Sequence, residues 1–302
     1  MRSTRFGAVI GVTLALSACI GGGGEAGGGG PITVSGVGFA TPESVLHDWS
    51  ADVYLVSNVN GSPLAKDGNG FISRLSPDGS VTELKWIDGA EDGVTLHAPK
   101  GMAYRRDTLF VADIDVVRLF DRTTGAPIGN WPVPGSTFLN DVAVGADGAV
   151  YVTDSGLRAG PDGFIRSGTD AVYKSTPQGE LVALVSGDAL GGPNGIVVDG
   201  GRVLFVTFGS GRVHLVQRES GTISGLPSPS AGQLDGVVKV AEGEFLISSW
   251  EGQAVYRLGR GGLYTTEVDS VEAPADIGLD ARRGRVLIPL FMANEVLIHP
   301  VK

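Results

Sequence analysis

The sequence has little cysteine, few basic residues and no long hydrophobic run. A single cysteine among 302 residues excludes an intramolecular disulfide, and the sequence holds no cysteine–histidine cluster for a zinc site. With 23 Lys and Arg against 33 Asp and Glu, the formal net charge is −10, so the chain lacks the basic surface that nucleic acid requires. No segment offers the roughly 20 apolar residues that a membrane-spanning helix needs. These absences leave an acidic, disulfide-free globular protein without a nucleic-acid partner.

The amino terminus resembles an export signal over residues 1–18. Two arginines precede an 11-residue apolar stretch, which is too short to cross a bilayer. The segment from Leu16 to Cys19 resembles the bacterial lipobox, whose cysteine becomes the lipidated first residue; an ordinary signal peptide with an incidental cysteine is the alternative. Residues 19–30 are mostly glycine and predict a flexible tether. We therefore expect a protein of the bacterial cell envelope, periplasmic or at the outer membrane, whose only membrane contact is the lipid on Cys19.

From residue 31 to residue 302 a short pattern occurs six times, at spacings of 40 to 57 residues. Each unit opens with Pro or Leu, a variable residue and an apolar run, and further β-branched or aromatic runs follow, separated by glycine-containing turns. The openings begin at Pro42, Pro99, Leu139, Pro193, Leu234 and Pro274. Short strands in repeated units of this length predict an all-β protein, a six-bladed β-propeller over residues 31–302.

The sixth unit predicts how the ring closes. It has room for only three strands before the chain ends, whereas the apolar segment 32–34 is left over at the front. Adding that segment to blade 6 as its fourth strand would cover an exposed sheet edge. We therefore expect the N-terminal strand to close the propeller.

The second residue of each opening is a candidate site residue, because the first strand of every propeller blade lines the central axis. In chain order these residues are Glu43, Lys100, Asn140, Asn194, Asp235 and Ala275. Four of them carry hard oxygen donors, which suit Ca²⁺ and do not suit zinc or copper. The alternative is that Asn and Asp recur because turns before strands favour them. The shared register leads us to predict a divalent metal, Ca²⁺, bound by Glu43, Asn140, Asn194 and Asp235.

The openings and the number of blades resemble the senescence-marker-protein/gluconolactonase family, which includes regucalcin, and more distantly the paraoxonases and squid-type phosphotriesterases. The resemblance covers residues 31–302. It implies that a Glu from blade 1, Asn residues from blades 3 and 4 and an Asp from blade 5 surround a divalent metal, which by register are Glu43, Asn140, Asn194 and Asp235. It also implies that Asp235 is a catalytic general base, unless that residue is only a ligand.

Two residues depart from the family pattern. Lys100 stands where paraoxonase-like relatives carry a histidine. Its ammonium either contacts the substrate or lies outside the metal ligands and pairs with Asp141 or Asp276. Phe138 stands where sugar lactonases carry an arginine, which favours a more apolar lactone or ester over a polyhydroxylated one. We predict Lys100 and Phe138 as substrate-binding residues.

The leading hypothesis is a monomeric, metal-dependent hydrolase of a small-molecule lactone or ester. The alternative is a non-catalytic propeller that binds a ligand or a protein at the cell envelope. The long connections 58–70 and 155–169 are expected as loops on the metal face. Aromatic residues just past the second strands, Phe208, Trp250 and Phe291, either wall the pocket or pack within the blades.

Overall fold

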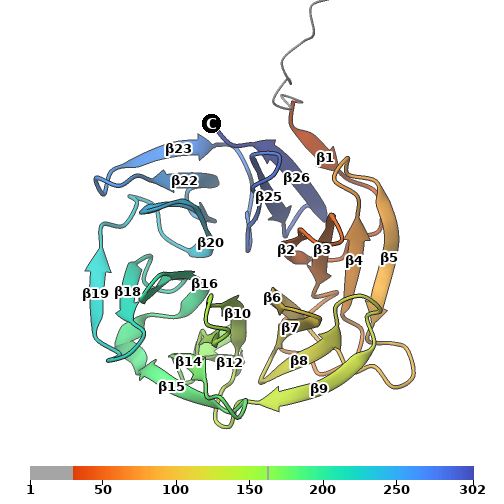
Figure 1. Ribbon diagram of the computed structural model, residues 1–302, viewed down its shortest axis with the longest axis horizontal. Helices are drawn as coiled ribbons and strands as arrows, with labels where there is room; N and C mark the ends of the chain where they lie inside the picture. The colour runs from red at the N-terminus through yellow and green to blue at the C-terminus, as the bar shows by residue number, and fades with distance from the viewer. Residues whose placement is uncertain (1–29, 162) are drawn as a thin grey trace, which may run out of the picture.

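Six four-stranded antiparallel sheets surround a central axis in the computed structural model, which describes residues 30–161 and 163–302 (Figure 1). The strands of blades 1 to 3 are β2 (Pro42–Asp48), β3 (Val53–Asn58), β4 (Phe71–Leu75) and β5 (Val81–Asp88); β6 (Pro99–Arg105), β7 (Thr108–Asp113), β8 (Val116–Asp121) and β9 (Pro127–Pro132); β10 (Leu139–Val144), β11 (Val150–Asp154), β14 (Ala171–Ser175) and β15 (Leu181–Ser186). Those of blades 4 to 6 are β16 (Pro193–Asp199), β17 (Arg202–Thr207), β18 (Val213–Gln217) and β19 (Ile223–Leu226); β20 (Leu234–Ala241), β21 (Glu244–Ser249), β22 (Ala254–Leu258) and β23 (Tyr264–Val268); β24 (Gly278–Asp280), β25 (Arg285–Leu290), β26 (Glu295–Pro300) and β1 (Ile32–Val34). The six-bladed β-propeller is confirmed.

Each of the six boundaries between neighbouring blades has its own cluster of buried apolar side chains. The second strands supply most of this core because both of their faces are covered, and β3, β7, β11, β17, β21 and β25 are almost entirely buried. The outermost strands, such as β9, are largely exposed. Helix formation plays almost no part: across the described ranges only a 3₁₀ turn at Asp188–Leu190 is helical, and no helix there is long and apolar enough to cross a membrane.

The N-terminal strand closes the ring as predicted. β1 pairs antiparallel with β26, with Ile32 opposite Ile298 and Val34 opposite Val296. Val34 is 5% exposed and belongs to the apolar cluster that joins blade 6 to blade 1. The first and last strands of the domain therefore share one sheet, and β1 gives blade 6 the fourth strand that the other blades have.

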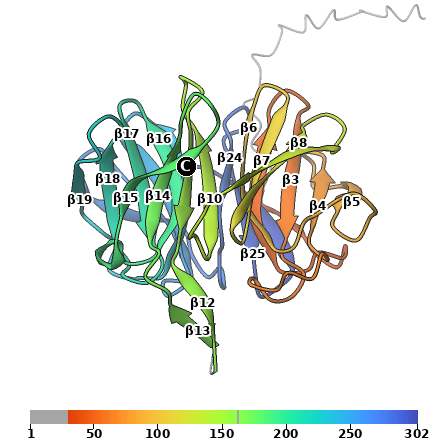
Figure 2. The same cartoon turned by 90° about the horizontal axis from the view of Figure 1, so that it is seen from below.

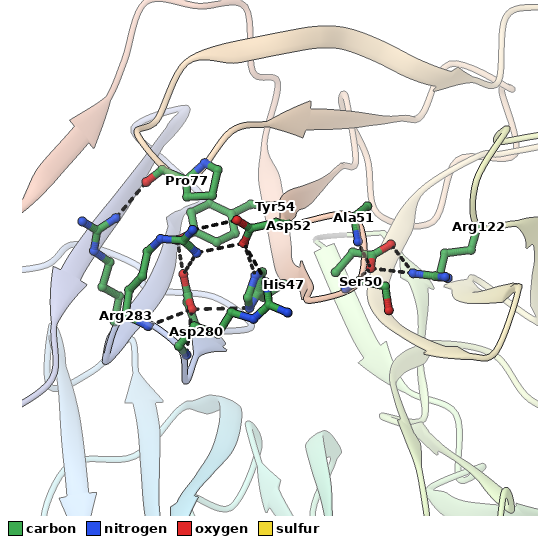
Figure 3. A network of polar contacts seen from close by, with 12 residues as sticks. His47, Ser50, Ala51, Asp52, Tyr54, Pro77, Arg122, Asp280 and Arg283 are labelled. Atoms are coloured by element: carbon green, nitrogen blue, oxygen red, sulfur yellow. Dashed lines mark hydrogen bonds and ion pairs between the residues drawn. The ribbon is translucent and has the colours of Figure 1, made fainter. Parts of the chain in front are cut away.

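A polar network reinforces the same seam at the face where β2 and β24 end (Figure 3). Arg283 pairs with Asp52 at 2.7 Å and with Asp280 at 2.9 Å, although 231 residues separate it from Asp52. Tyr54 donates to Asp280 at 2.7 Å, and the His47 ring lies between Asp52 and Asp280, at 3.2 and 3.5 Å. Blade 1 and blade 6 are thus joined by charged hydrogen bonds as well as by backbone pairing.

Of the remaining predictions, those for the amino terminus are not tested by the structure, and the one for the connection 155–169 is wrong. The export signal and the lipidation of Cys19 lie outside the described residues and stay predictions. The connection expected as a loop over residues 155–169 contains a regular two-stranded hairpin instead, β12 (Leu157–Gly160) with β13 (Gly163–Arg166). It protrudes from one face of the disc (Figure 2). Residues 157–160 pair with residues 163–166 across the hairpin. The prediction that this segment is a loop was therefore wrong.

Candidate functional site

A β-bulge lies at the start of the inner strand in each of blades 1 to 5. The pairing with the second strand shifts register between Pro42 and Ser44, and the equivalent shift recurs at the openings of β6, β10, β16 and β20. A bulge redirects the side chains next to it and frees backbone groups from the ladder. It is this repeated irregularity that brings the second residue of each opening toward the axis.

All five polar residues at that position are buried: Glu43, Lys100, Asn140, Asn194 and Asp235 are between 1% and 6% exposed. Four of them share a second property, a buried side-chain oxygen that accepts no hydrogen bond. These atoms are Glu43 Oε2, Asn140 Oδ1, Asn194 Oδ1 and Asp235 Oδ1. Buried polar atoms without partners are uncommon in folded proteins and each requires an explanation.

The unpartnered oxygens belong to the four predicted metal ligands. Two carboxylates and two amides, each with a free buried oxygen, form a donor set that a hard divalent cation such as Ca²⁺ would satisfy. Within the described ranges no three His, Cys, Asp or Glu side chains are grouped closely enough to hold a metal. A metal site here would therefore need oxygen donors besides carboxylates, such as the two amide oxygens, and the residues present fit such a group.

Negative charge is concentrated around the same point. Burial raises the pKa of Glu43 well above its usual range, and the charges of Asp235 and Asp276 raise it further, whereas Lys100 opposes the rise. Burial and Asp276 raise the pKa of Asp235 in the same way. The charge of Lys100 does not cancel the effect of burial on Glu43, and a bound cation would add positive charge beside both carboxylates.

The third residues of the openings form a second layer of buried groups, next to the first in sequence. Asp141 accepts backbone N–H groups of Val142 and Ile196, at 2.6 and 2.8 Å, and Ser44 donates to Asp276. Burial raises the pKa of Asp276 to about 7 against the Ser44 hydrogen bond, which lowers it. Elsewhere in this layer backbone comes too close for any side chain: a Cβ on Gly195 would lie 2.4 Å from the carbonyl oxygen of Asp235.

Lys100 and Phe138 lie together at the candidate site. The Lys100 ammonium is 4.4 Å from the centre of the Phe138 ring, a cation–π contact, and donates a hydrogen bond of 3.1 Å to the carbonyl of Ala98. Burial lowers the pKa of Lys100, and the charge of Glu43 opposes this. In the described ranges Lys100 forms no ion pair with Asp141 or Asp276, so the alternative that it pairs with either residue is wrong.

Sequence reasoning missed a set of supporting side chains one residue before the end of the second strands. Ser57, Thr153 and Ser248 accept the N–H groups of Ser44, Asp141 and Gly236, at 2.7 to 2.9 Å. These are the backbone groups that the bulges leave without ladder partners. A hydroxyl residue in the same register of three blades was the available signal.

A second missed set fixes the segments that lead into the inner strands. Asp113 accepts the N–H groups of His97 and Ala98, and Asp154 accepts those of Thr137 and Phe138, at 2.8 to 3.2 Å. Both aspartates are fully buried at the ends of second strands. They therefore position Lys100 and Phe138 through the backbone and not by contact with a substrate.

Comparisons with known proteins bear on the fold. No family model matches the chain, and no curated protein matches its sequence. Among solved structures, a gluconolactonase from Xanthomonas campestris is 20% identical, with 90% of this chain and 89% of that chain covered and a TM-score of 0.68. A second protein assigned as a gluconolactonase is 17% identical, with coverage of 91% and 93% and a TM-score of 0.70.

A structure of streptogramin B lyase is also similar, with a lower identity and TM-score. It is 12% identical, with 90% of this chain and 97% of that chain covered and a TM-score of 0.62. At such identities the likeness concerns the fold, and one fold supports unrelated chemistries. The chain therefore shares the six-bladed propeller fold of gluconolactonase structures, and its activity must be argued from its own site.

Proposed function

We propose that the protein is a metal-dependent hydrolase of a small-molecule lactone or ester. Its divalent metal, Ca²⁺, is held by Glu43, Asn140, Asn194 and Asp235. The observation that carries the proposal is the set of four buried oxygens without hydrogen-bond partners, one on each predicted ligand. The fold shared with gluconolactonase structures adds support for a lactone as substrate.

The chemistry divides between the metal and the protein's own groups. A bound Ca²⁺ supplies a Lewis acid that polarises a carbonyl and favours the oxyanion that develops on it. The Asp235 carboxylate has two oxygens, so one can bind the metal while the other accepts a proton from a water molecule. Lys100 uses one of its three N–H donors on Ala98, so two remain for an anionic part of the substrate or product.

Metal binding is tested through thermal stability, since a ligand that binds only the folded state raises the unfolding temperature. Ca²⁺ should stabilise the purified protein by about 2.7 kcal/mol at a concentration of 100 times Kd. N194A should abolish the rise. The matched control N130A, on the exposed strand β9, should retain it. No rise for the unsubstituted protein with Ca²⁺, Mg²⁺ or Mn²⁺ would overturn the metal site.

Catalysis is tested separately with a panel of lactones and aryl esters in the presence of the metal. Asp235→Asn keeps an oxygen for the metal but removes the proton acceptor. Retained Ca²⁺ stabilisation with lost hydrolysis is therefore the expected result. Hydrolysis at the original rate would reject Asp235 as the base. Metal binding without hydrolysis of any compound would favour the alternative function, a propeller that binds a ligand or a protein.

A further inference from the structure

The residue that follows the second strand occupies an equivalent position in all six blades. In blades 1, 3, 4, 5 and 6 its N–H donates to a carbonyl just before the inner strand, at 2.9 to 3.2 Å. In chain order the six residues are Val59, Ile114, Ser155, Phe208, Trp250 and Phe291. Five are apolar, and all lie on the face where the inner strands begin. A second register, apolar rather than polar, thus surrounds the candidate metal centre.

The five apolar residues form one continuous apolar ring, in which Val59 and Ile114 are buried and the three aromatic side chains are partly exposed. The rings of Phe208 and Trp250 meet edge to face at 5.4 Å, and Trp250 and Phe291 are also 5.4 Å apart. Phe291 packs against a cluster formed by Val59, Ala98 and Ile114. This cluster differs from the six blade boundaries because it joins residues of blades 1, 2 and 6 above the start of the inner strands.

Blade 3 completes the surface in another way. Its residue at this position, Ser155, uses its hydroxyl on the carbonyl of Pro193 at 2.6 Å. Phe138 provides the apolar surface instead, and its ring meets Phe164 of β13 edge to face at 6.2 Å. Phe164 is 54% exposed, and the hairpin that carries it extends from this face of the disc (Figure 2). Such an exposed aromatic beside a buried one offers unsatisfied apolar area to a ligand.

The apolar surface adjoins the polar site directly. The indole N–H of Trp250 is buried without a hydrogen-bond partner and lies near the Asp235 carboxyl. On the other side the Phe138 ring lies against Lys100. The guanidinium of Arg166, at the base of the hairpin, is engaged by Asp170 and by the carbonyl of Ser155. Arg166 is therefore held by the protein's own groups.

We infer that the substrate carries an alkyl or aryl group beyond its reacting carbonyl, and that this group lies against the partly exposed rings of Phe208, Trp250 and Phe291 and against Phe164 of the hairpin. The inference rests on the proposed hydrolase function and names its substrate class. Each methylene that leaves water for such a surface favours binding by about fourfold. A polyhydroxylated lactone would lose its hydration here without equivalent partners.

A homologous series of γ-lactones with lengthening alkyl chains tests the inference, with gluconolactone for comparison and Ca²⁺ present. The kcat/KM should rise about fourfold per methylene until the chain covers the surface, and gluconolactone should be the poorer substrate. Phe164→Ala should flatten the upper part of this dependence. The matched control Trp49→Ala removes an equally exposed aromatic, 58% exposed, at the far end of β2 and should leave the dependence unchanged.

The two possible failures are distinguishable. Hydrolysis that ignores chain length, or that favours gluconolactone, would overturn the apolar substrate class and leave the hydrolase intact. Absence of hydrolysis for every compound would overturn the proposed function. In that case calorimetric titration with the same lactones measures Kd directly. A Kd that does not fall with chain length would overturn the inference as well.

Discussion

The closing strand β1 supplies a quantitative prediction, made with the substitution Val34→Ala. Val34 is 5% exposed and packs among side chains of blades 1 and 6. Removing its two outer methyl groups costs about 1.6 kcal/mol in transfer free energy, and a residual cavity raises the loss to about 2–3 kcal/mol. For a domain of this size each kcal/mol lowers the unfolding temperature by about 2–4 °C, so Val34→Ala should lower it by about 4–12 °C.

The assay is thermal unfolding followed by circular dichroism, with Thr33→Ala as the matched control on the same strand. Thr33 is exposed between two inward-facing neighbours, and its substitution should change the free energy of unfolding by no more than about 0.5 kcal/mol. If both variants lost stability equally, the alternation of buried and exposed residues along β1 would be refuted. If neither lost stability, the strand would not close the ring.

The seam and the crowded inner layer yield two further predictions. Arg283→Ala should cost about 1–2 kcal/mol by removing a charged hydrogen bond from the buried Asp280. Burial would raise the pKa of Asp280, but the hydrogen bonds from Tyr54 and Arg283 outweigh it and lower that pKa. The stabilisation is therefore present above the unfolded pKa of about 3.9 and is lost as the pH falls below it, so denaturant titrations of the two proteins should converge at acid pH. A constant difference down to pH 2 would contradict this assignment. Gly195→Ala should lower the free energy of unfolding by about 3 kcal/mol or more, because the new Cβ would meet backbone atoms of Asp235 and Val237 at 2.4 and 2.8 Å. The control Gly201→Ala, whose Cβ meets nothing within 4 Å, should be nearly neutral in the same measurement. Equal stability of the two alanine variants would show that the inner layer can expand.

The repeat could be predicted from the sequence because the blades use the same residue types at the same positions. Pro or Leu, a polar residue and an apolar run mark each bulged inner strand, and a period near 40 residues leaves space for four short strands. The missing fourth strand of blade 6 then predicted the pairing of Ile32–Val34 with β26. Short sequence patterns were enough to predict the structure wherever the structural unit is formed by neighbouring residues and is repeated.

Other features depend on residues that are distant in sequence, and no local pattern announces them. The contact of Arg283 with Asp52 spans 231 residues and exists only because the ring closes. The hairpin of β12 and β13 was missed for a different reason. Its two short strands contain glycine and are almost entirely exposed, so their sequence lacks the alternation of apolar and polar residues that identifies a strand. The apolar ring was recognised only at its aromatic members, since Val59 and Ile114 are indistinguishable in sequence from ordinary core residues.

Charge distinguishes the two polar layers of the axis, although they occupy adjacent positions in each opening. Asp141 and Asp276 are third residues of their openings, and their oxygens accept hydrogen bonds from backbone N–H groups and from Ser44. Glu43 and Asp235 are second residues, and each keeps a buried oxygen without a partner. The nearby ammonium of Lys100 donates its hydrogen bond to a carbonyl and contacts an aromatic ring. The proposed cation is therefore assigned to the second residues, where two amide oxygens are also without partners, and not to Asp141 and Asp276.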